Sequence, residues 1–481
     1  MFHCNRSVFL RGVAAVGVGW LGLTSPGVGL AQPPIPDKVA LALCDVVRYL
    51  PPEPAADYLC SIAYLIILPD MFAAINTSGF GALTLGSLLL VSGAVQAQAR
   101  LSTGSQKPMP EQWLDQDTGH RVMRLTPPDG QNASFYFHNR PFLAGRDGDW
   151  MVYYHTDAQG KQLRMVNLKT RQVQPLTRYF QQKVGGEIVA PKRREVFYQT
   201  GDSVYATHVD TRRTRLVFVF PADFKADITT LNADETQLGG AWSSDAEKEI
   251  FRQYPEKHDF FNRIYEAGLP RTLFTVSTQG GQLTKLFTDT AWLNHVQFSP
   301  TDPRLLMFCH EGPWHKVDRI WTIDTRTKQV KLVHKRTVEG EIAGHEFFSP
   351  DGKTIWFDNQ KPRSVTFYLT GADVRTGKEK AYQMDRNEWS IHFNVSPDQK
   401  LFAGDGGDAG QVAKAPDGMW IYLFRPEGDK LKAEKLVNMK QHGYKLEPNI
   451  HFSPDGKWLI FRANFEGQEQ VYAVEIAKTA S

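Results

Sequence analysis

The chain has 481 residues, of which 42% are hydrophobic and 22% are charged, as is ordinary for a globular protein. The net charge is +3 without a basic run or tail, so we expect no nucleic-acid partner. Cys4, Cys44 and Cys60 lie near the N-terminus, and Cys309 stands alone in the rest of the chain. Once the N-terminal stretch is removed no disulfide can form within the chain, and we expect Cys309 to be a small buried residue.

The first hundred residues have the character of export signals. Residues 1–32 carry two arginines before an apolar run, and a second such segment extends from Met71 to the small-residue run Ala97-Gln98-Ala99. Two signals in tandem make little physical sense, so we expect the biological start at Met71 and an export region over residues 1–99. The apolar run 83–95 is too short and too rich in Gly and Ser for a membrane span. We expect a periplasmic or extracellular protein without a membrane span in its mature form.

From about residue 120 the chain is a repeat of short alternating strands and turns. Ser-Pro phrases recur at Pro300, Pro350, Pro397 and Pro454, which are 50, 47 and 57 residues apart, and each precedes a strand. Ser-Pro-Asp-Gly favours a tight turn, because Pro fixes φ, Asp bonds to its own backbone and Gly takes the left-handed position. A unit of about 50 residues is the size of one four-stranded propeller blade.

Three degenerate copies precede the four clear ones. The sequence therefore predicts an all-β domain over residues 100–481, a seven-bladed β-propeller of four-stranded antiparallel blades. Residues 121–126 form a candidate strand that joins the last blade to the first. Residues 242–270 are charged and predict an inserted, partly helical excursion, which in such arrays often shapes the binding site.

Histidines recur at one offset in this repeat. His295, His345 and His392 each stand five residues before a turn proline, and Asn449 holds that position in the last unit, followed by His451. Equivalent positions in neighbouring blades converge near the central channel, so we expect a ring of these side chains at its mouth. One such histidine would more often be structural, but three at one offset favour a functional ring.

Other candidate residues lie close to these histidines. His310 and Glu311 are followed by Gly312-Pro313, which forbids the helix of a zinc-protease motif. The run that begins at Arg386 lies shortly before His392. We take the candidate substrate contacts to be His310, Glu311, His392 and Arg386. The acidic loop Asp405-Gly406-Gly407-Asp408 can bind a cation, but we expect it to be a blade turn.

Several runs occur in the order found in a known family. They are Asp289-Thr290-Ala291-Trp292-Leu293-Asn294-His295, Phe308-Cys309-His310-Glu311-Gly312-Pro313, Gly344-His345-Glu346-Phe347, Gly404-Asp405-Gly406-Gly407-Asp408 and the opening Arg124-Leu125-Thr126-Pro127-Pro128-Asp129. Through them, residues 110–481 resemble the oligogalacturonate lyase family. The resemblance implies a carbon–oxygen lyase that cleaves short pectin fragments by β-elimination and leaves a 4,5-unsaturated uronate.

The resemblance also implies roles for particular residues. A base must remove the C5 proton of a uronate, a cation must neutralise its C6 carboxylate, and O4 must leave with a proton. His295 stands at the position of the family's base, and an imidazole can accept a proton at neutral pH. The family's arginine falls at Thr272 in a gap-free match, so Arg271, one residue earlier, is the candidate here.

A manganese ion is implied in the same way, held by His345 and by a Gln-x-x-His-x-His run. In this chain that run is Tyr444-Lys445-Leu446-Glu447-Pro448-Asn449, so Glu447 and Asn449 replace imidazoles with oxygen ligands. Such oxygens can hold Mn²⁺ or Ca²⁺, with His451 or His392 completing the shell. The alternative is a site without metal, in which Arg or Lys neutralises the carboxylate.

Two other functions stay open at this point. The altered ligand run fits a lyase for another uronate-containing oligosaccharide. The second function is that of a non-enzymatic propeller that binds a glycan or a protein, as TolB-type repeats with similar turns do. The histidine ring argues against it, because a scaffold does not need imidazoles at one offset.

Overall fold

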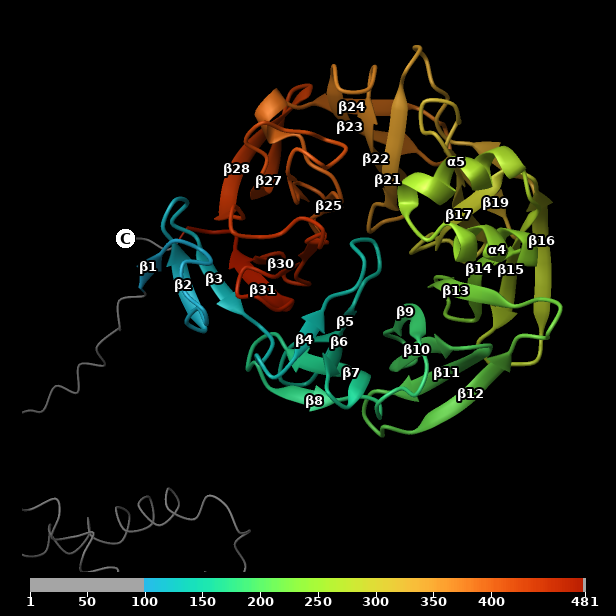
Figure 1. Cartoon of the computed structure of the whole chain (residues 1–481), viewed down its shortest axis with the longest axis horizontal. Helices are drawn as coiled ribbons and strands as arrows, with labels where there is room; N and C mark the ends of the chain where they lie inside the picture. Colours follow the sequence, from blue (N-terminus) through green and yellow to red (C-terminus); the bar gives the residue numbers. More distant parts are fainter. Residues whose placement is uncertain (1–98, 479–481) are drawn as a thin grey trace, which may run out of the picture. The chain divides into compact units, whose positions relative to one another are not determined.

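The computed structural model describes residues 99–478, which form a ring of β-sheets around a central axis (Figure 1). The predicted export region, with its start at Met71, lies outside the described residues except for Ala99. Within residues 99–478 no helix is long and apolar enough to cross a membrane.

Each sheet in the first part of the ring contains strands that follow one another along the chain. The first sheet has β4 (Gln131–Ala133), β5 (Phe142–Leu143), β6 (Trp150–Asp157), β7 (Gly160–Asn167) and β8 (Val173–Pro175). The second has β9 (Val184–Ala190), β10 (Glu195–Thr200), β11 (Ser203–His208) and β12 (Thr214–Val219). The third has β13 (Ala226–Leu231), β14 (Gln237–Ser243), β15 (Arg271–Ser277) and β16 (Leu283–Asp289). The fourth has β17 (Trp292–Phe298), β18 (Leu305–Glu311), β19 (Ile320–Asp324) and β20 (Val330–Leu332).

An eight-stranded sheet follows, in which two antiparallel groups of four are joined only where Gln383 pairs with Lys430. The first group is β21 (Ile342–Phe348), β22 (Thr354–Gln360), β23 (Phe367–Asp373) and β24 (Glu379–Gln383). The second is β25 (Asn394–Val395), β26 (Phe402–Gly404), β27 (Trp420–Glu427) and β28 (Lys430–Asn438), and a short 3₁₀ helix, Arg386–Glu388, lies between the groups. These four-stranded antiparallel sheets confirm the predicted all-β propeller class. The number of seven blades stays a prediction, with which the strand groups agree.

The last sheet joins the two ends of the domain. It contains β29 (His451–Phe452), β30 (Trp458–Ala463) and β31 (Gln470–Glu475), followed by β3 (Arg121–Arg124), β2 (Gln112–Asp115) and β1 (Arg100–Leu101). Strand β3 pairs antiparallel with β31, with Val122 opposite Val474. The strand predicted over residues 121–126 therefore closes the ring, as expected from the need of a propeller to protect its sheet edges.

The Ser-Pro-Asp turns fold as their residues predict. In the Ser349 turn the hydroxyl donates to Asp351 Oδ1 (2.7 Å) and accepts from the backbone N–H of Thr354 (3.0 Å). Gly352 has φ 67°, in the left-handed region, and a side chain there would collide with Thr301. The Ser396 and Ser453 turns repeat the hydroxyl-to-Asp bond. This local chemistry fixes where each inner strand stops and the next one starts.

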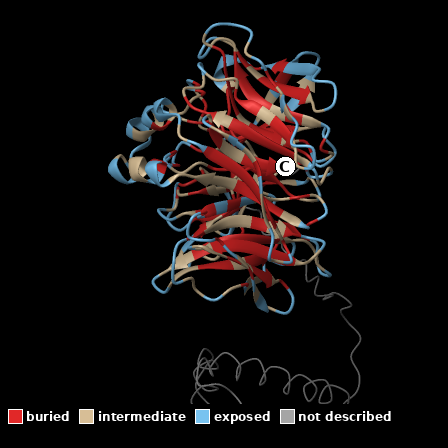
Figure 2. Cartoon of the chain, turned by 90° about the vertical axis from the view of Figure 1, so that its right-hand side faces the viewer, coloured by how far each residue is buried: buried red, intermediate tan, exposed pale blue. Residues whose placement is uncertain are grey.

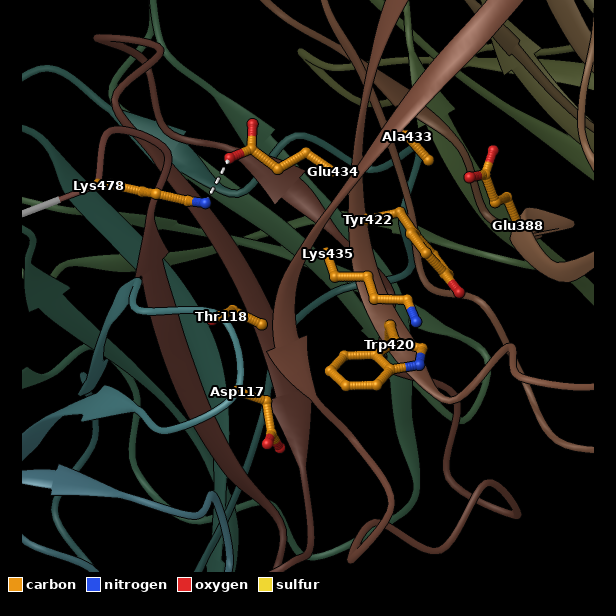
Figure 3. A pocket seen from close by; sticks show the side chains of 9 residues that line it. All are labelled: Asp117, Thr118, Glu388, Trp420, Tyr422, Ala433, Glu434, Lys435 and Lys478. Carbon is orange, nitrogen blue, oxygen red and sulfur yellow. Dashed lines mark ion pairs between the residues drawn. The ribbon is translucent and has the colours of Figure 1, made fainter.

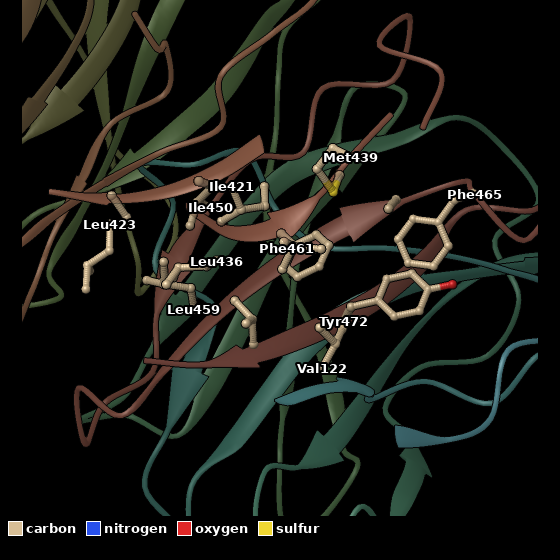
Figure 4. Close-up of a cluster of buried hydrophobic side chains, with 14 of the residues drawn as sticks. Val122, Ile421, Leu423, Leu436, Met439, Ile450, Leu459, Phe461, Phe465 and Tyr472 are labelled. Carbon is tan, nitrogen blue, oxygen red and sulfur yellow. The ribbon is translucent and has the colours of Figure 1, made fainter. Parts of the chain in front are cut away.

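Apolar side chains of neighbouring sheets pack against each other and form the core. Figure 4 shows one such cluster, in which Ile421 and Leu436 of one sheet lie near Phe461 and Tyr472 of the next. Most buried residues lie on the strands, and most exposed residues lie in the loops and the two helices (Figure 2). Since a single blade cannot bury both faces of its sheet, stacking of neighbours supplies the hydrophobic burial that stabilises the fold.

The insertion between β14 and β15 is helical, as predicted for residues 242–270. It contains α4 (Asp245–Gln253) and α5 (Lys257–Ala267), which stand out from one side of the ring (Figures 1 and 2). Ser244 caps α4 by accepting the N–H of Glu247, and Gly268 ends α5 in the left-handed conformation with φ 52°.

Candidate active site

The residues at the repeated offset share an unusual backbone conformation. His295, His345, His392 and Asn449 have φ of 46°, 49°, 46° and 50°, in the left-handed region that side chains other than Gly rarely adopt. Strands β17 and β21 carry a bulge there, because their registers shift between Asn294 and Gln297 and between Gly344 and Phe347. A bulge re-aims a side chain, and backbone strain of this kind concentrates at functional sites. The repeat therefore positions these side chains by one local device.

His345 and His392 form a pair, and Nδ1 of each ring contacts a buried carboxylate. His345 Nδ1 lies 2.6 Å from Asp358 Oδ1, and His392 Nδ1 lies 2.8 Å from Asp405 Oδ2. The two ring centroids are 4.7 Å apart. Because each carboxylate lies at Nδ1, the Nε2 atom of each ring is the one directed away from it.

Glu447 completes this group on one side. Its Oε2 lies 3.6 Å from His392 Nε2, which is buried and has no hydrogen-bond partner among the described residues. Burial raises the pKa of Asp405, and Asp405 in turn raises the pKa of His392 against the opposing effect of burial. Nε2 of His392 therefore lies near one carboxylate oxygen, and its ring lies beside that of His345.

Asn449 and His451, both predicted as metal ligands, form hydrogen bonds to the segment between β4 and β5. Asn449 Oδ1 accepts the N–H of Phe137 (3.0 Å), and His451 Nε2 lies 3.1 Å from the carbonyl oxygen of Asn139. Both residues thus hold the segment between β4 and β5, which reaches toward the centre of the ring (Figure 1). Burial lowers the pKa of His451 to about 4, so this imidazole stays neutral.

His295 lies in a separate polar cluster. Its Nε2 is 3.3 Å from Glu311 Oε2, while Arg319 donates to Glu311 Oε1 (2.7 Å) and to Glu346 Oε2 (2.9 Å). Burial would raise the pKa of both carboxyls, but the Arg319 guanidinium outweighs it and holds the pKa of Glu346 below and that of Glu311 well below the usual range. Glu311 is therefore ionised next to Nε2 of His295, and Nδ1 is the ring nitrogen that does not face this carboxylate.

Cys309 lies within 4.8 Å of His295 and Glu311, so this trio has the spacing of metal ligands. Its donor set does not suit Mn²⁺, because a cysteine sulfur is a soft ligand that favours Zn²⁺ or Cu(I). Burial raises the pKa of the Cys309 thiol well above its usual value. Cys309 is buried, as predicted.

A cavity of about 510 Å³ connects the two groups, because His295, Glu311, His345 and Glu447 all line it. Its remaining wall comes from loops and from helix α5: Tyr136, Lys257, Phe261, Asn262, Pro313, Trp314, His315, Arg319, Arg363, Ile391, Gly410, Gln411, Val412 and Lys414. His392 packs behind this surface, since its ring contacts that of His345. Two of the four offset residues, His295 and His345, therefore face one concave, polar and aromatic site.

Six of the ten predicted site residues do not line this cavity, and besides His392, Asn449 and His451 they are Arg271, His310 and Arg386. Arg271 donates to Glu247 Oε2 (2.8 Å) and to the carbonyl oxygen of Leu293 (2.7 Å). His310 stacks on Trp321 with ring centroids 4.8 Å apart. Arg386 lies over the ring of Trp389 at 4.1 Å and donates to the carbonyl oxygen of Lys414. In the structure these three side chains contact protein groups rather than the cavity.

Several residues of the site were not predicted from sequence. Asp358 and Asp405 each follow their histidine by 13 residues, a repeated spacing that could have identified them as partners. Glu346 stands directly after His345 in a run already singled out. Arg319, Trp314 and Tyr136 have no counterpart in the repeat, so only the folded chain brings them to the cavity.

A second hollow, of about 340 Å³, lies beside β27 and β28 (Figure 3). It is lined by Asp117, Thr118, Glu388, Trp420, Tyr422, Ala433, Glu434, Lys435 and Lys478. It contains none of the offset residues and no histidine, so we do not place the chemistry there.

A propeller with an imidazole base candidate, a carboxylate-supported histidine pair and a cation-lined cavity has the parts of a lyase for acidic sugars. The sequence profile described as oligogalacturonate lyase matches residues 104–480, and the chain belongs to that family.

Named relatives agree with this assignment. Oligogalacturonate lyase of Dickeya dadantii (strain 3937) is 24% identical over 383 residues, which cover 76% of this chain and 95% of the relative. Oligogalacturonide lyase of Pectobacterium atrosepticum is 25% identical over 393 residues, with the same coverage. Two solved structures share the fold at 24% identity, covering 76% of this chain and 96% of theirs: an oligogalacturonate lyase in complex with manganese (TM-score 0.67) and one from Vibrio parahaemolyticus (TM-score 0.66).

Proposed function

We propose that this protein cleaves oligogalacturonides by β-elimination, with His295 as the general base. The observation that carries the proposal is the position of the His295 imidazole, half-buried in the wall of the cavity with Glu311 fixing its tautomer. The relatives named for this activity support the same substrate. The protein is expected to meet its substrate outside the cytoplasm, after export.

The reaction follows from the chemistry of a 4-linked uronate. Nδ1 of His295 takes the C5 proton, the C4–C5 double bond forms, and the C4–O4 bond breaks as O4 leaves and gains a proton. Ionised Glu311 stabilises the imidazolium that results, as a carboxylate does for a catalytic histidine elsewhere. The products are a fragment with a 4,5-unsaturated uronate at its new end and a second fragment with a free hydroxyl.

We place the proposed divalent cation at the histidine pair, where Nε2 of His392 lies 3.6 Å from Oε2 of Glu447. His345 and His392 offer Nε2 atoms, one of them buried without a partner, and Glu447 offers a carboxylate oxygen. Carboxylates on the Nδ1 side of both rings are the usual support for metal-bound histidines. Such a mixed nitrogen and oxygen set suits Mn²⁺. When bound, the cation would neutralise the C6 carboxylate and so acidify the C5 proton.

The test is incubation of the purified protein with di-, tri- and tetragalacturonate, with and without a chelator. Ultraviolet absorbance and mass spectrometry should show a 4,5-unsaturated product, and chelation followed by Mn²⁺ should abolish and restore it. Full activity in chelator would favour the alternative in which an Arg or Lys side chain, and not a metal ion, neutralises the C6 carboxylate. Cleavage of oligomannuronate or oligoguluronate instead would support the alternative uronate substrate, and no product from any of these would refute the proposal.

A further inference from the structure

His295, Cys309 and Glu311 come from two adjacent strands of one sheet. Cys309 and Glu311 are two residues apart on β18, so their side chains share one face of that strand. His295 lies on β17, directly after Asn294, the residue that pairs with Cys309. A ring nitrogen, the thiol sulfur and a carboxylate oxygen of the three side chains all lie within 4.8 Å of one another. The paired strands therefore hold three metal-ligating groups around one point.

The spacing of these groups is close to that of a tetrahedral zinc site. Zinc binds nitrogen and oxygen ligands at about 2.0–2.2 Å, which puts neighbouring N and O ligands about 3.3–3.5 Å apart. Nε2 of His295 and Oε2 of Glu311 are 3.3 Å apart. A sulfur ligand at about 2.3 Å from the ion would lie about 3.5 Å from each of them, so Cys309 Sγ needs to approach by no more than about 1.3 Å.

Glu311 presents one carboxylate oxygen to this point, while its other oxygen is held by protein donors. Oε1 accepts from Arg319 (2.7 Å) and from Nε1 of Trp314 (2.9 Å). Oε2 faces His295 and accepts from no other residue of the described part of the chain. Donors of this kind behind a ligand orient it and are part of the usual construction of a metal site.

The charges and the access route also suit a cation. Glu311 and Glu346 are ionised and share the single positive charge of Arg319, so these three buried groups carry one negative charge in excess. A Zn²⁺ ion that displaces the thiol proton of Cys309 brings the total charge to zero. His295 and Glu311 line the cavity, which gives the ion its route of entry. The soft sulfur selects Zn²⁺ over Mn²⁺.

We infer that His295, Cys309 and Glu311 bind Zn²⁺, and that the bound ion inhibits the enzyme. A metal ion at Nε2 uses the lone pair of that nitrogen, so the neutral ring carries its proton on Nδ1. Nδ1 then cannot accept the C5 proton of a uronate. Zinc binding stands on the geometry of the three side chains, whereas the inhibition rests on the proposed function. The site is separate from the one at which we place the activating cation, the histidine pair.

The binding test uses Co²⁺ as a spectroscopic substitute for Zn²⁺. A thiolate bound to Co²⁺ gives a charge-transfer absorbance band in the near ultraviolet, and added Zn²⁺ should remove it because Zn²⁺ binds more tightly. Cys4, Cys44 and Cys60 are present in the full chain, so the band is measured as a difference from Cys309→Ala and Cys309→Ser. The matched control is Glu447→Gln, which alters only the histidine-pair site and should keep the band. No band in the wild type, or an equal band in both Cys309 variants, would overturn the inference.

Steady-state kinetics at saturating Mn²⁺ test the inhibition. Zn²⁺ should inhibit the cleavage of trigalacturonate. Cys309→Ala should raise the half-inhibiting Zn²⁺ concentration at least about tenfold, since even an outer partner of a metal ligand contributes that much to affinity. Cys309 does not line the cavity, so turnover without Zn²⁺ should be near that of wild type.

The outcomes separate the two proposals. Equal inhibition of wild type and Cys309→Ala would place the inhibiting ion at the histidine pair and refute inhibition through Cys309. If the wild type cleaves no oligogalacturonide, the proposed function fails, and the Co²⁺ difference spectrum alone decides the zinc site. A band that is lost in both Cys309 variants would then support the site, and an unchanged band would refute it.

Discussion

Nδ1 of His345 lies 2.6 Å from Oδ1 of Asp358, and the relation recurs in the next four strands, where His392 Nδ1 lies 2.8 Å from Asp405 Oδ2. The repeat has thus supplied both imidazoles and the carboxylates that orient them. Both histidines have the left-handed backbone conformation, and their ring centroids lie 4.7 Å apart.

Replacing Asp405 by Asn should weaken cation binding without removing a ligand. A carboxylate behind a metal-binding imidazole fixes its tautomer and raises its basicity, and its loss typically lowers metal affinity by about 10- to 100-fold. Titration calorimetry with Mn²⁺ measures this directly. Asp429→Asn, in the exposed hairpin between β27 and β28, is the control. Unchanged affinity in Asp405→Asn would show that the histidine pair does not bind the ion.

Asn449→Ala separates a ligand from a structural residue. The substitution leaves the buried N–H of Phe137 without its acceptor, so we expect a loss of about 1–3 kcal/mol in unfolding free energy. Mn²⁺ affinity should stay within about twofold of wild type, because the amide oxygen is already used. A large fall in affinity in a stable variant would restore Asn449 to the metal shell.

His295→Ala should lower kcat by a factor of about 10² to 10⁴, the usual range for a positioned general base. His295 is half-buried at the cavity wall, so thermal stability should change little. Steady-state kinetics on trigalacturonate and a melting curve are the two measurements. Near-normal turnover in the folded variant would exclude the role, and His392 would be tested next, since His310 does not line the cavity.

Arg271 should prove to be a positioning residue. Its guanidinium donates to Glu247 and to the Leu293 carbonyl oxygen. Arg271→Ala leaves the buried Glu247 carboxylate without its partner, so we expect the free energy of unfolding to fall by about 3–5 kcal/mol. The double variant Arg271→Met with Glu247→Met should recover much of that stability in urea unfolding. It should also recover turnover. A stable double variant with turnover reduced more than about 10²-fold would instead place Arg271 in the chemistry.

His442 should make stability fall in weak acid. Its Nε2–H donates to the Leu446 carbonyl and its Nδ1 accepts the N–H of Asn464, so protonation at Nδ1 would break the second bond. Burial lowers the pKa of His442 to about 4. In the folded state the ring stays neutral, while the unfolded state takes up a proton below the ordinary pKa near 6.5. This residue therefore contributes nothing to pH dependence above pH 7, and its stabilisation is lost as pH falls from about 6.5 toward 4.

The full effect is about 3 kcal/mol at pH 4, from the pKa difference. Urea unfolding of wild type and His442→Asn at pH 7.5, 5.5 and 4.5 isolates this residue, because other titrating groups are common to both proteins. The difference in unfolding free energy between wild type and His442→Asn should become smaller as the pH falls. A constant gap would show that the imidazole does not titrate as described.

The sequence by itself determined the repeating architecture. It also determined which position of the repeat, five residues before the turn proline, carries the candidate site histidines. Ser-Pro-Asp-Gly turns act through local backbone chemistry, so each one marks a blade without knowledge of the rest of the fold. The offset of His295, His345 and His392 is a property of the repeat, and the three residues share the left-handed backbone conformation.

Only the tertiary structure decided which neighbours each of these side chains meets. Asn449 and His451 are bound by a segment more than 300 residues away in sequence, and Arg319 joins carboxylates from two different sheets. Arg271 donates to Glu247 because the inserted helix α4 places this buried carboxylate within reach of the guanidinium. Such contacts depend on how loops and insertions fill the space above the ring, and that packing is non-local, so no repeat spacing encodes it.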